Sequence, residues 1–176
     1  MANNQQRPGQ PRNADRRRRE DGRNRRSGPD QKQPSGAIRQ LCESVAFAAG
    51  ASGALDPALF DETAREAAKI VGEEGNHLNK PSQLRKFYDE LLMWEERVHG
   101  NGPERAEDHL RQYLPLIRML NAKAAYAQGR NHVGPDFVHL LRRCLEQIED
   151  KPETLRHARL FFEAFMGFYK TLRPTD

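Results

Sequence analysis

Two short segments of the chain carry basic side chains at positions that suit phosphate binding. In the first, Arg85 and Lys86 follow a predicted helix start at Pro81, while Leu84 and Phe87 take the core-facing positions of the same turn. The first turn of a helix presents unpaired N–H groups and the positive end of the helix dipole, which favour an anion. This segment therefore predicts a phosphate-binding surface.

The second segment is rich in alanine and lies about forty residues further on. Lys123 and Tyr126 are three residues apart and share a helix face, Arg130 stands at the predicted helix end, and Arg118 lies about one turn earlier. The small alanines between them would allow a ligand to approach the backbone closely. This arrangement again favours a polyanion such as nucleic acid.

A solvated helix surface is the alternative interpretation of these cations. Arg85 lies four residues before Asp89, and Lys86 lies four residues before Glu90. Pairs at this spacing form weak ion pairs along one helix. The sequence leaves both interpretations open.

The sequence shows none of the motifs that we associate with catalysis or with metal binding. It contains no GxxxxGK[ST] or GxGxxG loop, and none of its six histidines belongs to an HExxH motif. Neighbouring carboxylates such as Glu95 and Glu96 are adjacent, so they do not converge on one helix face. We therefore predict no catalytic residues, no metal and no cofactor, and a metal-dependent helical enzyme is the least favoured reading.

Charge and hydropathy divide the chain at about residue 36. The whole chain has a net charge of +4, but residues 1–36 carry ten basic and four acidic side chains, and the remainder carries a net −2. The first 36 residues contain almost no apolar side chains, which predicts a disordered tail. Its arginines could form a nucleic-acid arm or a solubilising tail. Residues 37–176 are predicted to form one domain.

Apolar residues in that domain recur at helical spacing, which predicts an all-α fold: a single compact bundle of about six helices. Pro115 is expected to kink one helix or divide it in two. Cys42 and Cys144 are predicted to be buried, reduced thiols of a cytoplasmic protein, and no apolar run is long enough to span a membrane. The predicted helices cover residues 38–49, 56–71, 81–98, 104–128, 135–150 and 153–172.

Three segments occurring in order carry a family resemblance. They read SQLRKFY at 82–88, AAYAQGR at 124–130 and FEAFMGFYK at 162–170. Together they resemble the small helical subunit of the type III-A CRISPR (Csm) interference complex, from about Leu55 to the C-terminus. The Arg-rich tail and the Ala-rich residues 37–54 depart from that pattern and receive no role from it.

The resemblance implies a non-catalytic helical bundle in antiviral defence. Copies of such a subunit stack in a ribonucleoprotein filament, beside the backbone subunits that hold the crRNA and near the polymerase-like large subunit, and contact the crRNA–target RNA duplex independently of sequence. The residues that it implies to face RNA are Arg85, Lys86, Lys123 and Arg130, with lower weight on Lys80, Arg118, Lys170 and Arg173.

A helical adaptor that binds only protein is the alternative function. The last predicted helix carries an unusually wide apolar face that includes Phe161, Phe165 and Phe168. Such a face is either central to the bundle or shared with a partner subunit.

Overall fold

The computed structural model describes residues 1, 33–48, 54–100 and 102–173. Apart from Met1 and residues 33–36, the predicted basic tail lies outside the described residues. Within them the fold is all-α, as predicted, with no strand and with one helix more than the six expected. The α-helices are α1 (Gly36–Ser44), α2 (Glu62–Gly72), α3 (Pro81–His99), α4 (Ala106–Arg118), α5 (Leu120–Gly129), α6 (Pro135–Glu146) and α7 (Pro152–Leu172). Short 3₁₀ turns, η1 (Pro57–Phe60) and η2 (Pro103–Arg105), precede α2 and α4.

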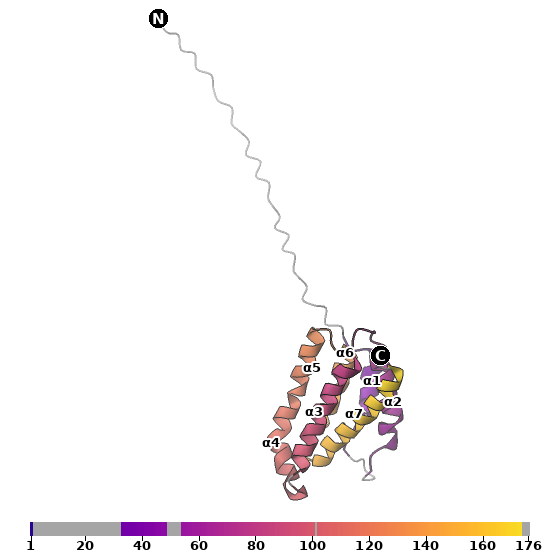
Figure 1. Ribbon diagram of the computed structural model, residues 1–176, viewed down its shortest axis with the longest axis vertical. Helices are drawn as coiled ribbons and strands as arrows, with labels where there is room; N and C mark the ends of the chain where they lie inside the picture. Colours follow the sequence, from indigo (N-terminus) through magenta and orange to yellow (C-terminus); the bar gives the residue numbers. More distant parts are fainter. Residues whose placement is uncertain (2–32, 49–53, 101, 174–176) are drawn as a thin grey trace.

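The helices pack so that α3 and α7 lie side by side (Figure 1). α4 and α5 continue one another along the other flank of α3, and α1, α2 and α6 complete the bundle. α7 contacts α2, α3 and α4, so it is a central helix of the bundle. None of the helices in the described ranges has the length and apolar character that a membrane span requires.

Prolines mark three of the helix starts as the sequence predicts. Pro81, Pro135 and Pro152 each occupy a first position, where a missing N–H costs nothing. Asp56 caps the turn that follows it, accepting a hydrogen bond from the N–H of Ala58 at 3.0 Å. One start is different: the helix expected over 56–71 is interrupted at Asp61, where the 3₁₀ turn η1 gives way to α2.

The predicted long helix over 104–128 is divided, but not at its proline. Pro115 lies inside α4, and the break falls four residues later, at Met119. The N–H of Met119 bonds the carbonyl of Leu116 at 3.1 Å, an i→i−3 contact that tightens the last turn and ends α4. α5 begins at once, so the two helices remain almost in line.

The wide apolar face of α7 lies in the centre of the bundle. Phe161 and Phe165 are fully buried, and Phe137 of α6 lies 6.4 Å, ring centroid to ring centroid, from Phe165. Phe168 is partly buried and is covered by the Arg65 guanidinium at 4.8 Å from its ring. Phe161 and Phe165 therefore belong to the core, whereas Phe168 keeps part of its surface exposed, so most of the apolar face that the adaptor hypothesis invoked lies inside the bundle.

The two cysteines are buried and unpaired, as predicted. Burial raises the pKa of the Cys42 thiol from 9.0 to about 11, and it also raises the pKa of Cys144. Both thiols are thus protonated at neutral pH and shielded from reagents.

We expect an aromatic disulfide reagent at pH 8 to label neither thiol rapidly in the folded protein and both in guanidinium. Because the fold holds the Cys42 thiol protonated, its contribution to stability is complete below pH 9.0 and is lost as the pH rises toward 11. A thiol that reacts within seconds in the native protein would contradict this burial.

Candidate nucleic-acid interface

The first turns of α3 expose the first pair of predicted cations. Leu84 and Phe87 are buried, so Arg85 and Lys86 leave the helix on its solvent side. Arg85 Nε lies 2.6 Å from Asp89 Oδ1, and this hydrogen bond and charge raise the pKa of the guanidinium. Lys86 Nζ donates instead to Gln83 Oε1 at 3.2 Å. Lys86 therefore does not form the ion pair with Glu90 that its spacing suggested.

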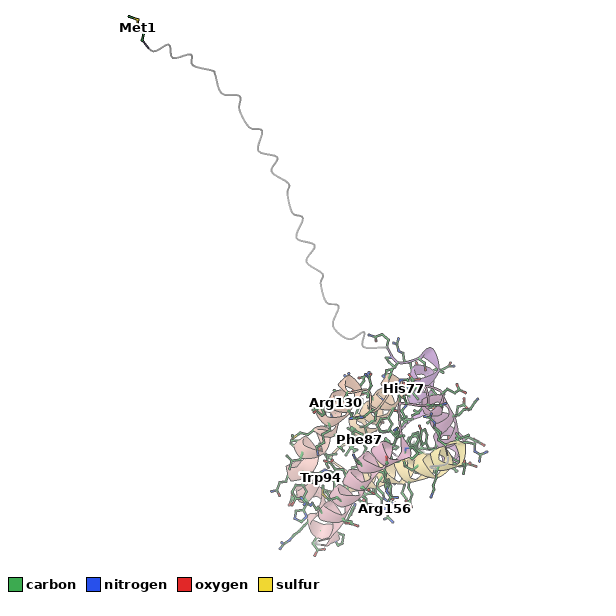
Figure 2. The ribbon with its side chains drawn as sticks, turned by 45° about the horizontal axis from the view of Figure 1, so that its top comes forward. Met1, His77, Phe87, Trp94, Arg130 and Arg156 are labelled. Atoms are coloured by element: carbon green, nitrogen blue, oxygen red, sulfur yellow. The ribbon has the colours of Figure 1, made fainter. Side chains whose placement is uncertain are left out.

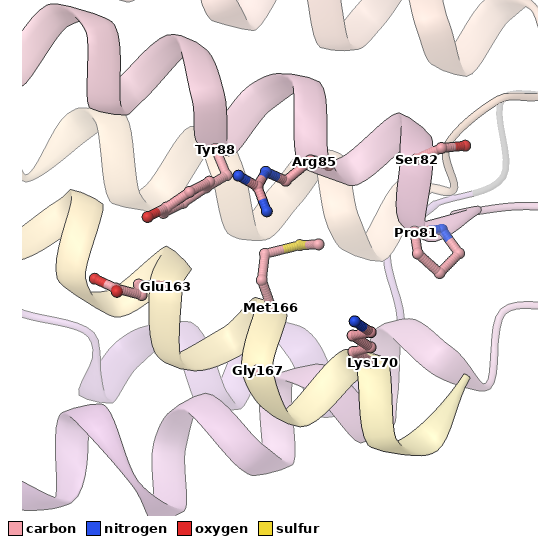
Figure 3. Close-up of a pocket in the computed structure, with 8 residues that line it drawn as sticks. All are labelled: Pro81, Ser82, Arg85, Tyr88, Glu163, Met166, Gly167 and Lys170. Carbon is pink, nitrogen blue, oxygen red and sulfur yellow. The ribbon is translucent and has the colours of Figure 1, made fainter. Parts of the chain in front are cut away.

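A groove of about 470 Å³ separates this part of α3 from the C-terminal half of α7 (Figure 3). Arg85 extends from α3 toward Met166, and Lys170 lies on the same side of α7 near Pro81. Tyr88 forms part of the wall, and its ring lies 5.1 Å from the Arg85 guanidinium carbon. Glu163, which is paired with Arg159, also lines the groove, so two cations and one carboxylate border its apolar floor. The two cations can take a phosphate beside a flat, apolar group.

The second set of cations lies on one face of α5. This helix buries Leu120 and Ala124 and exposes Lys123, Tyr126 and Arg130. Arg130 Nη1 donates to the Tyr126 hydroxyl at 3.2 Å, and Tyr126 is 67% exposed, an unusual state for a large aromatic residue. Figure 2 labels Arg130, which follows the last residue of α5.

An ion pair joins the two sets across the helix boundary. Lys123 of α5 bonds Glu90 of α3, which lies one turn after Lys86. Arg85 is the neighbour of Lys86 and shares the groove with Lys170. The cations therefore lie along one surface that crosses three helices, which we call the basic strip: Arg130, Lys123, Lys86, Arg85 and Lys170.

The remaining predicted candidates have other surroundings. Lys80 is exposed directly before α3, at the end of the helix that carries Arg85. Arg118 Nη2 donates to the carbonyl of Ile148 at 3.2 Å, on the turn that leads into α7. Arg173 is half-buried, and its guanidinium donates to the carbonyl oxygens of Gly75 and Leu78, at 3.1 and 3.0 Å. Arg118 and Arg173 thus tie loops to helices, a role that the sequence did not reveal.

Ion pairing covers only part of the strip. Arg85 and Lys123 have carboxylate partners, whereas within the described ranges Lys86 and Arg130 contact only neutral side chains. Exposed ion pairs contribute at most about 1 kcal/mol, so a phosphate can replace such a carboxylate. Over the same ranges, no group of three or more His, Cys, Asp or Glu side chains is arranged to hold a metal ion.

The fold and this surface define the chain's class: a small all-helical bundle protein with a cationic face and a near-neutral body. The family model described as Csm2 Type III-A matches residues 55–175. The chain therefore belongs to the Csm2 family, and it is a subunit of the type III-A CRISPR effector complex. Searches of curated proteins and of solved structures returned no match.

Proposed function

We propose that this subunit is non-catalytic and binds the crRNA–target RNA duplex through the basic strip, independently of sequence. The observation that carries the proposal is the gathering of five cations from α5, α3 and α7 on one surface, although residues 37–176 have a net charge of −2. Electrostatic attraction to RNA depends on where the charges lie as well as on their sum.

The chemistry of the strip suits an A-form duplex. Such a duplex is recognised mainly through phosphates and 2′-hydroxyls, because its deep major groove admits no side chains. Exposed Lys and Arg side chains supply phosphate contacts, and the Tyr126 hydroxyl can bond a sugar or a phosphate. A subunit with these groups accepts any guide sequence, as an RNA-guided complex requires.

The proposal includes the position of the subunit in the assembly. Copies of the chain stack along a filament beside the backbone subunits that hold the crRNA and near the polymerase-like large subunit, in the cytoplasm, as part of antiviral defence. Membership of the Csm2 family and the strip, which runs across the bundle rather than ending in a closed pocket, support this position.

Replacing Arg85, Lys86, Lys123 and Arg130 with Ala is expected to raise the Kd for an RNA duplex roughly a hundredfold at 0.1 M salt. Each lost phosphate contact also lowers the slope of log K against log salt by about 0.7–0.9. Fluorescence anisotropy with a labelled duplex of two unrelated sequences measures both quantities, and circular dichroism checks that the helices persist.

Two further variants sharpen this test. Asp89→Asn with Glu90→Gln removes the carboxylates that pair with Arg85 and Lys123, so it should tighten binding several-fold. Arg111→Ala, on α4 and paired with Asp108, should leave binding unchanged. An unchanged Kd for the fourfold variant at low and moderate salt would contradict RNA binding by the strip.

A further inference from the structure

Helix α1 lies outside the part of the chain that the Csm2 family model matches, yet it is built firmly into the bundle. Its first turn is held by Asp136 of α6, whose Oδ1 accepts a hydrogen bond from the N–H of Ser35 at 2.6 Å. Its end is held by Arg143 of α6, which donates to the carbonyls of Cys42 at 3.0 Å and Val45 at 3.1 Å. The orientation of α1 on α6 is therefore fixed at both ends.

This docking builds a second cationic pocket, separate from the groove between α3 and α7. Arg39 of α1 joins His139 and Arg142 of α6 around a cavity of about 430 Å³, whose wall also includes Gln33 and Gln128. Ile38, the neighbour of Arg39, is fully buried, which anchors the turn that carries the guanidinium. The pocket thus combines three nitrogen-rich side chains from two helices.

The electrostatics of the pocket favour an anion. Partial burial lowers the pKa of His139, and the charges of Arg39 and Arg142 lower it further, against smaller opposite effects of Asp136 and Glu146. Arg142 Nε lies 2.9 Å from Glu146 Oε1 in an exposed pair. Over the described ranges no carboxylate lies within ion-pair distance of Arg39. An anion in the pocket would pair with the Arg39 guanidinium, which has no such carboxylate partner there.

We propose that the pocket of Arg39, His139 and Arg142 binds a backbone phosphate of the same RNA that the basic strip engages. The inference rests on the proposed function and extends it to a segment outside the family match. Gln128, in the pocket wall, and Arg130 of the strip both lie at the end of α5 but point to opposite sides of it, so the pocket and the strip flank the same helix end. Gln33, which lines the pocket, directly follows in the sequence a segment, residues 1–32, that contains nine arginines.

The choice of RNA over an acidic peptide follows from the position of both surfaces at the end of α5. RNA has a phosphate at every nucleotide, so a strand leaving the strip at Arg130 carries regularly spaced anions toward Arg39 and Arg142. Arginine binds phosphate with paired N–H donors, and the pocket offers two guanidinium groups. The role of α1 is then to enlarge the RNA footprint of the subunit.

The test uses the full-length chain with Arg39→Gln and Arg142→Gln combined, and the labelled RNA duplex. We expect the Kd to rise roughly tenfold at 0.1 M salt and the salt slope to fall by about 1.5, the effect of two phosphate contacts. The matched control, Arg105→Gln with Arg111→Gln, removes the same charge from η2 and α4 and should bind as the wild type does. Equal affinities of the two double variants would overturn the proposal.

The fourfold strip variant, measured beside the two double variants, separates RNA binding by the basic strip from phosphate binding by the pocket. Weak binding by the strip variant with normal binding by Arg39→Gln/Arg142→Gln refutes the pocket alone, whereas normal binding by both refutes the proposed function.

A second measurement needs no variant. A bound phosphate favours the imidazolium form, so titration of His139 by NMR should show a higher pKa in the RNA complex than in the free protein. RNA that binds without moving the His139 pKa, or an acidic peptide that moves it equally at the same concentration, would overturn the assignment.

Discussion

Asn79→Ala is expected to lower the free energy of unfolding by about 3–4 kcal/mol. The Asn79 side chain is fully buried, and its amide nitrogen donates to the carbonyl of Val71 at 3.0 Å and to Glu74 Oε2 at 2.7 Å. Its Oδ1 accepts from the N–H of Gly134 at 2.8 Å. Alanine leaves buried groups without partners, at about 1–3 kcal/mol each, which is a large share of a stability of roughly 5–15 kcal/mol.

The matched control for this change is Asn131→Ala. Asn79 and Asn131 both have left-handed backbones, with φ of 55° and 56°, so alanine pays a similar conformational cost of about 1 kcal/mol at each position. Asn131 is exposed, and its side chain makes no hydrogen bond within the described ranges. Urea unfolding of both variants isolates the buried contacts. Equal losses of stability would show that the Asn79 hydrogen bonds contribute nothing.

The contacts of Asn79 also matter for the proposed RNA surface, because they hold the start of α3 in place. The carbonyl of Asn79 accepts a hydrogen bond from the Tyr169 hydroxyl of α7 at 2.7 Å, two residues before Pro81. The turn that carries Arg85 is thereby held to the helix that carries Lys170. We expect Asn79→Ala to weaken RNA binding only under conditions where the protein begins to unfold.

Phe137→Ala is expected to lower the free energy of unfolding by about 3–5 kcal/mol. Phe137 of α6 has no exposed surface, and its ring centroid lies 5.3 Å from that of Phe87 and 6.4 Å from those of Phe162 and Phe165. Truncation opens a cavity where three helices meet, and those rings cannot collapse to fill it.

Two further variants provide controls for the Phe137→Ala prediction. Phe137→Leu retains most of the apolar volume, so we expect a loss of about 1–2 kcal/mol. Phe168→Ala removes a ring of equal size from a partly buried position, where solvent and Arg65 already cover one side, and should cost less than Phe137→Ala. Guanidinium unfolding monitored by circular dichroism measures all three. A smaller loss for Phe137→Ala than for Phe168→Ala would contradict the central place of α6 in the core.

The sequence predicts the fold well where local signals agree. Apolar spacing and an initial proline give α3 and α7 almost to the residue. The division at Asp61 was not predicted, because the apolar spacing continues through it from η1 into α2. Pro115 indicated a break in the long helix. The break falls at Met119 instead, because it depends on backbone hydrogen bonding that the sequence pattern does not encode.

The candidate site was predicted only in part, since its assembly is tertiary. The exposed positions of the cations on α3 and α5 could be predicted from their spacing relative to the buried residues of each helix. The partner of Lys123 could not, because Glu90 lies on another helix and is distant in sequence. Arg173 looked like a surface cation and is instead a donor to loop carbonyls. The groove shared by Arg85 and Lys170 requires the packing of α3 on α7, which periodicity alone cannot orient.

The attachment of α1 also has a consequence for the order of folding. Two of the three hydrogen bonds that hold this helix to α6, from Ser35 to Asp136 and from Arg143 to Cys42, join groups 101 residues apart. Contacts across so long a loop carry a larger closure entropy and form slowly, whereas α3 and α4, or α5 and α6, are neighbours along the chain. We therefore expect α1 to dock last and to open first, so that amide hydrogens of α1 exchange with solvent well before those of α7.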